Sequence, residues 1–300
     1  MNGPSAPAAQ GPVSVVVATR NRPQRLRACL AAITTTLRDG DELLVVDSAS
    51  TTRETLAVAE AAGARILRLE APGASRARNA GWKAARHRRI AFTDDDCLPQ
   101  RGWLDALAGH PHADFVTGRV EAPAPVDRPV AVKTDAEPAA LDASTHEPLG
   151  ASNNLLVGRE LLECTGGFDE RLGPGTWPES AEDLALFDRL LHAGGRGQYE
   201  PAALVLHEQW RARRELVRLD WGYGKGQGAR LALLRGPDRR RARDRRRRLL
   251  WDDGAASAAR DLRAGYEFGA LTTAVRTVGT AVGYGYGRVA LRSLWMGEDT

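Results

Sequence analysis

Four short apolar runs, each about as long as a buried strand, alternate with helical segments over the first third of the chain. The apolar runs are residues 13–18, 42–47, 64–69 and 90–93. The segments between them carry helical patterning over residues 24–36, 53–62 and 74–87. Runs rich in β-branched residues are typical of strands that are buried on both faces. The alternation predicts an α/β, Rossmann-like fold with a mostly parallel sheet and flanking helices.

Polar side chains follow three of these predicted strands. They are Thr19, Arg20, Asn21 and Arg22 after the first strand, Asp47 after the second, and Asp94, Asp95 and Asp96 after the fourth. In sheets of this kind, ligands bind at the carboxyl ends of the strands. We therefore expect these side chains to line one crevice.

The chain lacks the glycine-rich loops that bind phosphates in many α/β folds. There is no G-x-G-x-x-G after the first strand and no G-x-x-x-x-G-K-[ST] anywhere. Phosphate groups would then be bound by basic side chains and a metal ion, with Arg20, Arg22, Arg76 and Arg78 as candidates. Each of these arginines, taken alone, can equally be a solvated charge on a helix.

Three consecutive carboxylates, Asp94 to Asp96, end the fourth predicted strand. Adjacent carboxylates repel one another, and a divalent cation with a polyphosphate ligand would neutralise them. Mg²⁺ and Mn²⁺ prefer such oxygen ligands. The alternative is a solvated acidic turn that caps a helix over residues 102–109.

Composition limits the class of protein. The net charge is +4 and the three cysteines have no paired spacing, which favours a reducing, cytoplasmic compartment without disulfides. Residues 1–12 resemble a disordered leader, because they lack the apolar core of a signal peptide. No uncharged apolar stretch reaches 18 residues, so we expect no transmembrane helix.

Motifs spread along the chain resemble those of the family 2 glycosyltransferases, which have the GT-A fold. The matching stretches, in order, are residues 13–26, 45–47, 73–81, 92–97, 150–155, 166–170, 182–190, 194–196 and 200–207. Each stretch is weakly specific alone, but their order and spacing both fit. The resemblance covers about two-thirds of the chain and implies an inverting enzyme that uses a nucleotide-diphosphate sugar.

The resemblance implies a donor site at the strand ends. Asp47 takes the position of the nucleotide-base contact, where a carboxylate can accept the imide N–H of uracil. Asp96 is implied as the ligand of Mn²⁺ or Mg²⁺, with His207 completing the coordination, although a surface histidine is an equal alternative. The other donor-binding residues are Thr19, Arg22, Arg76, Asp94 and Asp95.

The resemblance also implies a general base. Asp183 would deprotonate the acceptor hydroxyl, with Glu182 beside it, at the start of a helix over residues 182–193. Acidic residues at that position also suit the helix dipole, which is the alternative explanation. Trp177 can stack on an acceptor or pack under a loop, and Asn154, like Asn153, can bind a hydroxyl or belong to a turn.

The predicted organisation has three parts. A leader, 1–12, precedes a catalytic domain, 13–208, with a nucleotide-sugar half (13–100) and an acceptor half (101–208). Residues 122–148 interrupt the alternation as a Pro- and Ala-rich loop. A helical, basic extension, 209–300, follows.

The basic extension contains the densest charge run of the chain, Arg239 to Arg248. This run is either a solvated helix or, with the segment up to residue 295, a peripheral contact with the inner face of a membrane. The segment can equally pack on the catalytic domain or a second subunit, as in a homodimer. We expect no nucleic-acid partner. The glycine-rich run 222–228 does not follow a strand, so it is not interpreted as a phosphate-binding loop.

The sequence therefore predicts transfer of a single sugar from a UDP-linked donor to an acceptor hydroxyl. One alternative is a nucleotidyltransferase, which the residues after the first strand do not match. The other is a nucleotide-sugar-binding scaffold that works through its basic tail. Replacement of Asp183 would abolish turnover of a transferase but leave a scaffold active.

Overall fold

The computed structural model describes residues 11–291, except for 127, 143–144, 146–149 and 235–237 and the side chains of 238–242. The chain forms two compact units, which are considered one at a time. The first comprises residues up to 168 together with 186–209, and the second comprises 169–185 together with the residues from 210 onward. The predicted leader lies almost entirely outside the described residues.

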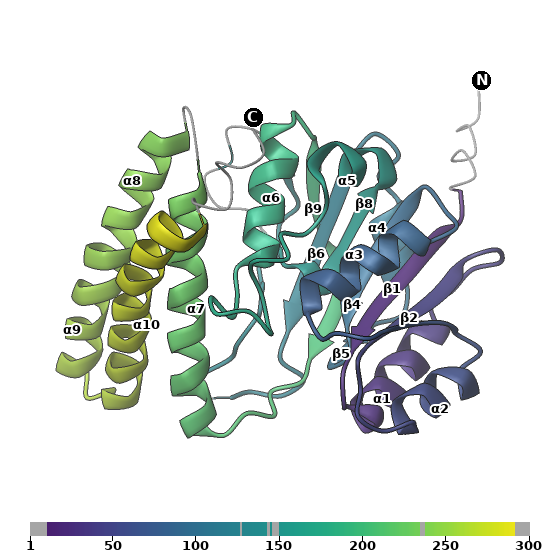
Figure 1. Cartoon of the computed structure of the whole chain (residues 1–300), viewed down its shortest axis with the longest axis horizontal. Helices are drawn as coiled ribbons and strands as arrows, with labels where there is room; N and C mark the ends of the chain where they lie inside the picture. Colours follow the sequence, from purple (N-terminus) through teal and green to yellow (C-terminus); the bar gives the residue numbers. More distant parts are fainter. Residues whose placement is uncertain (1–10, 127, 143–144, 146–149, 235–237, 292–300) are drawn as a thin grey trace. The chain divides into compact units, whose positions relative to one another are not determined.

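The first unit begins with the predicted alternation of strands and helices (Figure 1). Its elements are β1 (Val13–Thr19), α1 (Pro23–Thr34), β2 (Glu42–Ser48), α2 (Glu54–Ala61), β3 (Arg65–Leu69), α3 (Ala74–Ala84) and β4 (Arg89–Asp94). The four strands are parallel, in the order β3-β2-β1-β4. The α/β fold expected from the apolar runs is confirmed.

The sheet continues beyond β4 with strands that were not predicted individually. The further elements are β5 (Cys97–Pro99), α4 (Trp103–Ala108), β6 (Phe115–Glu121), β7 (Ala139–Leu141), the 3-10 turn Ser152–Asn154, β8 (Leu155–Gly158), α5 (Arg159–Thr165) and β9 (Gly197–His207). Strand β8 is antiparallel to β4 and β6, whereas β9 is parallel to β6. The short β7 pairs with β9, so the predicted irregular loop 122–148 contributes a strand to the sheet.

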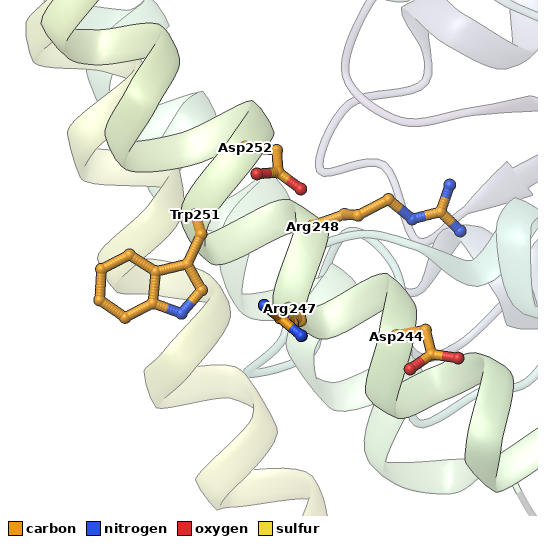
Figure 2. Close-up of a pocket in the computed structure, with 5 residues that line it drawn as sticks. All are labelled: Asp244, Arg247, Arg248, Trp251 and Asp252. Atoms are coloured by element: carbon orange, nitrogen blue, oxygen red, sulfur yellow. The ribbon is translucent and has the colours of Figure 1, made fainter.

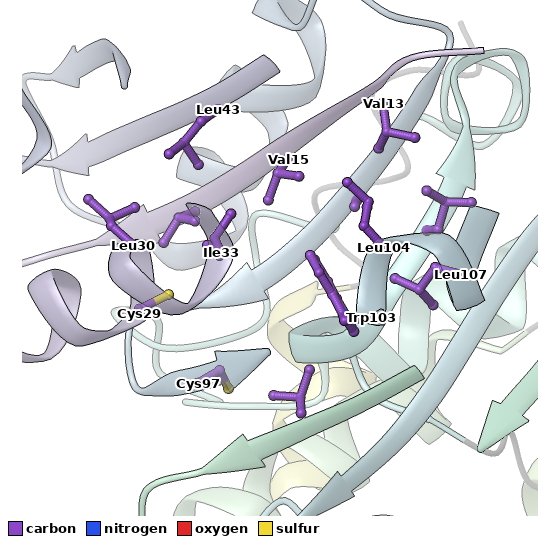
Figure 3. Packing of buried hydrophobic residues seen from close by; sticks show 14 of the residues in the cluster. Val13, Val15, Cys29, Leu30, Ile33, Leu43, Cys97, Trp103, Leu104 and Leu107 are labelled. Atoms are coloured by element: carbon purple, nitrogen blue, oxygen red, sulfur yellow. The ribbon is translucent and has the colours of Figure 1, made fainter. Parts of the chain in front are cut away.

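Alternate residues of the strands supply two hydrophobic cores, one on each face of the sheet. On β1, Val15 and Val17 face helices α1 and α4, where they pack with Leu30 and Trp103 (Figure 3). Val16 faces the opposite way, toward α3 and the apolar side of α6 (Glu182–His192). Burial on both faces explains why the strands are nearly continuous in apolar residues.

The second unit is helical, as predicted for the C-terminal part of the chain. It contains α7 (Arg213–Leu233), α8 (Asp238–Leu250), a π-helical turn (Trp251–Ala255), α9 (Ala256–Arg263), α10 (Glu267–Tyr286) and a last π-helical turn (Gly287–Leu291). Residues 169–185 belong to this unit and not to the first, which differs from the predicted boundary at 208. Among the described residues, no helix combines the length and apolarity needed to cross a membrane.

The glycine-rich run 222–228 lies within α7. Its glycines are buried against neighbouring backbone, for example Gly224 against α10 (Figure 1). Close packing of two helices outweighs the low intrinsic helix propensity of glycine.

The edge of the first unit that carries the amino ends of β1 and β2 is closed by a buried glutamate, Glu42. Its carboxylate accepts hydrogen bonds from the Ser14 hydroxyl at 2.6 Å, the Arg86 amide at 2.8 Å and the Arg65 guanidinium at 2.9 Å. Burial alone would raise the pKa of Glu42, but these hydrogen bonds lower it below the usual value.

We expect Glu42→Gln to reduce the free energy of unfolding at pH 7 by about 1–3 kcal/mol, because the ionised carboxylate binds three donors. A depressed pKa contributes stability above the pKa of the unfolded state, and this contribution is lost as the pH falls. The variant should therefore lose less stability than the parent between pH 7 and about pH 4. Urea titrations at both pH values measure the free energy of unfolding, and Glu60→Gln, at an exposed position of α2, is the control. An equal pH dependence of parent and Glu42→Gln would contradict this prediction.

Candidate active site

The acidic triplet lies where β4 ends and the chain turns into β5. Strand pairing aligns Thr19 with Asp47 and Ala18 with Asp94, so the ends of β1, β2 and β4 lie at one edge of the sheet. Strand β5 then pairs with the end of β9, which places Cys97 opposite His207. The convergence of strand ends expected from the sequence is confirmed by this register.

Asp95 is buried and joins the triplet to the end of β1. Its two carboxylate oxygens accept hydrogen bonds from the Thr19 hydroxyl at 2.8 Å and the Arg22 guanidinium at 2.9 Å. Arg22 also lies 3.4 Å from Asp96. Burial raises the pKa of Asp95 to about 6, with the neighbouring Asp96 adding to the increase and Arg22 opposing it.

Asp94 is neutralised by a different arginine, Arg78. The guanidinium of this buried side chain on α3 lies 2.6 Å from the Asp94 carboxylate and 5.5 Å from the centre of the Phe168 ring. The triplet is thus braced by two arginines that the sequence had suggested as phosphate ligands. Arg76, two residues earlier on α3, is exposed.

Asp47 is completely buried at the end of β2. One carboxylate oxygen accepts a hydrogen bond from the Ser50 amide at 3.1 Å. The other lies 3.7 Å from Arg68 and makes no hydrogen bond within the described part of the chain. A buried carboxylate oxygen without a donor is costly, so this atom is suited to accept an N–H from a ligand.

His207, at the end of β9, is oriented by backbone groups. Its Nδ1 lies 3.1 Å from the carbonyl oxygen of Val130 and 3.0 Å from the side-chain amide nitrogen of Gln209. Gln209 also binds the backbone of Val130. Its side-chain nitrogen donates to the Val130 carbonyl oxygen at 3.1 Å, and its side-chain oxygen accepts from the Val130 N–H at 2.9 Å. These contacts orient the ring so that Nε2 lies 3.5 Å from the Asp96 carboxylate.

This arrangement fits a divalent cation. Asp96, Cys97 and His207 place one ligand atom each within 4.8 Å of the others, and all three side chains are buried. A carboxylate oxygen and an imidazole nitrogen this close together are suited to bind Mn²⁺ or Mg²⁺ when the nitrogen is deprotonated. Burial raises the pKa of the Cys97 thiol well above its usual value, so the thiol is the poorest ligand of the three.

Asn154 has a structural role in the first unit, and its contact with the acceptor stays a prediction. The side chain is fully buried, and its amide oxygen accepts from the Trp103 indole at 2.8 Å. Its amide nitrogen donates to the carbonyls of Arg119 at 2.9 Å and Ala203 at 2.7 Å. Both amide hydrogens of this side chain are therefore bound within the described part of the chain.

We expect Asn154→Ala to lower the free energy of unfolding by about 3 kcal/mol, because three buried groups lose their partner. The neighbouring Asn153 is a matched control, since it is equally buried but its side-chain oxygen makes no hydrogen bond among the described residues. Asn153→Ala should cost about 1 kcal/mol or less. Chemical denaturation compares the two variants, and equal losses would contradict the structural role of Asn154.

The remaining predicted residues lie in the second unit. Glu182 is buried and Asp183 half-buried in the first turn of α6, where Asp183 accepts a hydrogen bond from the Leu184 amide at 2.7 Å. Trp177 stacks on Tyr286 at 4.1 Å between ring centres, and the Lys225 ammonium lies 4.8 Å from the same indole. The indole is nevertheless 43% exposed, so its role toward an acceptor stays a prediction.

Three residues with clear roles in these clusters were missed by sequence reasoning. They are Gln209, which clamps Val130 beside His207, Arg68, which approaches Asp47, and Lys225, which contacts Trp177. Only Lys225 lay within a motif that the sequence singled out, the glycine-rich run.

A separate surface pocket lies on α8 and the π-helical turn after it. It is lined by Asp244, Arg247, Arg248, Trp251 and Asp252 (Figure 2). The lining mixes both signs of charge around an exposed indole. None of the predicted site residues contributes to this pocket.

The comparisons with known proteins agree with the fold. Residues 14–131 match the model of a family described as Glycosyl transferase family 2. A pre-mycofactocin glycosyltransferase of Mycobacterium tuberculosis is 34% identical over 251 residues, which is 79% of this chain and 50% of the relative. The glycosyltransferase AglE of Haloferax volcanii is 28% identical over 57% of this chain and 61% of its own length. The chain thus spans about half to three-fifths of these relatives.

Solved structures show the same architecture at low sequence identity. The mannosyltransferase PcManGT from Pyrobaculum calidifontis, in complex with GDP-Man and Mn²⁺, is similar with a TM-score of 0.65 and 20% identity over 94% of this chain and 91% of that one. S. aureus TarS 1–349, in complex with UDP-GlcNAc, has a TM-score of 0.60 and 15% identity over 94% and 92%. The family match, the relatives and the shared fold show that the chain belongs to the family 2 glycosyltransferases of GT-A fold.

Proposed function

We propose that this protein transfers one sugar from a nucleotide-diphosphate sugar to an acceptor hydroxyl, with inversion at the anomeric carbon. The observation that carries the donor part is the meeting of Asp47, Asp96 and His207 at one edge of the sheet. Two structures of the same fold hold UDP-GlcNAc and GDP-Man with Mn²⁺, which supports a nucleotide sugar and a divalent cation here.

Asp47 is proposed to recognise the base. Its buried oxygen without a hydrogen-bond donor suits the imide N–H of uracil, so a UDP sugar is the favoured donor. Thr19, Arg22 and Asp95 form a connected network beside it. Arg76, exposed in the first turn of α3, is proposed to bind the donor phosphates.

Asp96 and His207 are proposed to hold the cation. When bound, Mn²⁺ or Mg²⁺ would act as a Lewis acid that stabilises the departing nucleoside diphosphate. Gln209 and the Val130 carbonyl hold the His207 ring with its Nε2 directed toward Asp96. Asp94 stays paired with Arg78 and stabilises the turn from outside the coordination sphere.

Asp183 is proposed as the general base. It would accept the proton of the acceptor hydroxyl as that oxygen attacks the anomeric carbon, while Glu182 keeps the local field negative. One base and no enzyme nucleophile give a single displacement and therefore inversion. A peripheral membrane contact through 239–295, a cytoplasmic location and a homodimer stay predictions.

The donor proposal is tested by measuring the binding and slow hydrolysis of UDP, GDP and dTDP sugars with and without Mn²⁺. We expect the tightest binding for UDP sugars and a requirement for the cation. Equal, metal-independent binding of all three classes would contradict the proposed site.

A further inference from the structure

The segment 173–181, which leads directly into the proposed base, has an unusual backbone. Glu179 and Ala181 have φ values of 64° and 71°, in the left-handed region that non-glycine residues rarely adopt. Such conformations persist only where the surrounding structure holds them. The question is therefore which groups of the second unit hold this segment.

Lys225, on α7, makes three contacts with the segment from one ammonium group. It donates a hydrogen bond to the Trp177 carbonyl at 2.7 Å, lies 3.1 Å from the Glu179 carboxylate and lies over the Trp177 ring. The side chain is only 5% exposed. Burying a charge is costly unless it is paired, and here a carbonyl, a carboxylate and an aromatic face share it.

The glycines around Lys225 let the segment and α10 approach α7 from two sides. A Cβ atom on Gly222 would lie 2.8 Å from the Glu179 carboxylate, and one on Gly226 would overlap Ser180. On the other side, Cβ atoms on Gly224 and Gly228 would overlap the α10 backbone. The Ser180 hydroxyl also donates to the Gly222 carbonyl at 2.9 Å. The alternating glycines thus form two i, i+4 pairs with different neighbours.

Lysine is an exceptional choice in this chain. The sequence has three lysines among 42 basic residues, and Lys225 is the only one of them that is buried. A compact ammonium carries three donors at one point, whereas the planar guanidinium of arginine needs a wider set of acceptors. Because the carbonyl, the carboxylate and the aromatic face all converge on one point, this site suits lysine.

The segment fixed in this way ends at the proposed base. The Ala181 carbonyl accepts a hydrogen bond from the Ala185 N–H at 3.0 Å. This bond is the first of the helix that carries Glu182 and Asp183. Tyr223, two residues before Lys225, has a pKa raised to about 12, chiefly by burial and also by the charges of Asp183 and Glu182. These carboxylates therefore lie near the same stretch of α7.

We propose that Lys225 is a positioning residue that holds segment 173–181 on α7 and so sets the orientation of Asp183. The role of Asp183 rests on the proposed function, but the holding of the segment does not. Trp177 anchors the segment in this arrangement, because Lys225 contacts both its carbonyl oxygen and its ring.

The first test measures amide hydrogen exchange in the full-length protein without ligands. Lys225→Met should speed exchange in peptides covering 173–185 by about 10-fold or more, because the contacts that oppose local opening of this segment are lost. Glu179→Gln, which removes only the ion pair, should cause a smaller increase in the same peptides. Lys83→Met is the matched control, since Lys83 is exposed and also lies over an indole, that of Trp82. Unchanged exchange at 173–185 in both Lys225→Met and Glu179→Gln would overturn the proposal.

The second test separates positioning from general stability. With water as acceptor and the UDP sugar that is hydrolysed fastest, Lys225→Met should lower kcat about 10-fold and leave the donor KM unchanged. A rise in KM with unchanged kcat would overturn the proposal. Asp183→Asn should lower kcat without changing exchange at 173–185. If it leaves kcat unchanged, the proposed base fails, while the exchange result for Lys225 still stands.

Discussion

Asp183→Asn is expected to lower kcat by about 10²- to 10⁴-fold, the usual contribution of a general base. The amide is nearly isosteric with the carboxylate but cannot accept the acceptor's proton at neutral pH. Affinity for UDP in the presence of Mn²⁺ should stay within about twofold, because the substitution removes an interaction made mainly in the transition state. Steady-state kinetics and titration calorimetry on the same preparation measure the two effects.

Glu182→Gln is the matched control for this prediction, because Glu182 precedes Asp183 in the same helical turn and is the more buried of the two. Its loss of kcat should be at least about 10-fold smaller than that of Asp183→Asn. A larger loss for Glu182→Gln would move the base to that residue. The product's anomeric configuration, read by NMR at early times, should be opposite to that of the donor, and retention would contradict a single displacement.

Asp96→Asn and His207→Ala are each expected to weaken Mn²⁺ binding in the presence of UDP by about 10- to 100-fold or more, since outer partners alone contribute that much in metal sites. The Asp96→Asn substitution removes a charged oxygen ligand. The His207→Ala substitution removes the imidazole nitrogen, whose ring is held by Gln209 and Val130. The amplitude of the free Mn²⁺ signal in electron paramagnetic resonance measures the bound fraction. Substitution of either residue should leave metal-free folding intact, which circular dichroism can verify.

Cys97→Ala distinguishes between kinds of metal site. The thiol lies within the same cluster of possible ligands, yet its raised pKa and the preference of Mn²⁺ for oxygen and nitrogen ligands speak against a bond. Mn²⁺ affinity of Cys97→Ala should stay within about threefold of the parent. A loss as large as that of Asp96→Asn would show that the thiol is a ligand and that a softer cation belongs in the site.

The donor half of the fold was predictable from the sequence because its signals are local. Buried parallel strands need continuous apolar runs, and the polar residues that follow them, Thr19, Asp47 and Asp94, lie at one edge by register alone. The antiparallel strands β5, β7 and β8 have three or four residues each, too few for a periodic pattern to stand out.

The partners of the predicted residues were not predictable. The sequence suggested a cation to neutralise the acidic triplet, but pairing with Arg22 and Arg78 depends on side chains 16 or more residues away. From the sequence, Asn154 could be either a substrate contact or part of a turn, whereas its partners in the structure come from three distant elements. Lys225 lies in a glycine-rich run, and the low helix propensity of glycine gives no sign that tertiary packing builds this run into a helix.

The construction of α7 has a consequence for how the second unit comes together. Each glycine in a helix interior is disfavoured by about 1 kcal/mol relative to alanine, so a helix with glycine at 222, 224, 226 and 228 has little tendency to form alone. Its two flanks are completed by segments far apart in the chain, 173–181 and α10. Helix α7, segment 173–181 and helix α10 must therefore assemble together, so the packing of α7 cannot be completed before α10 has been synthesised.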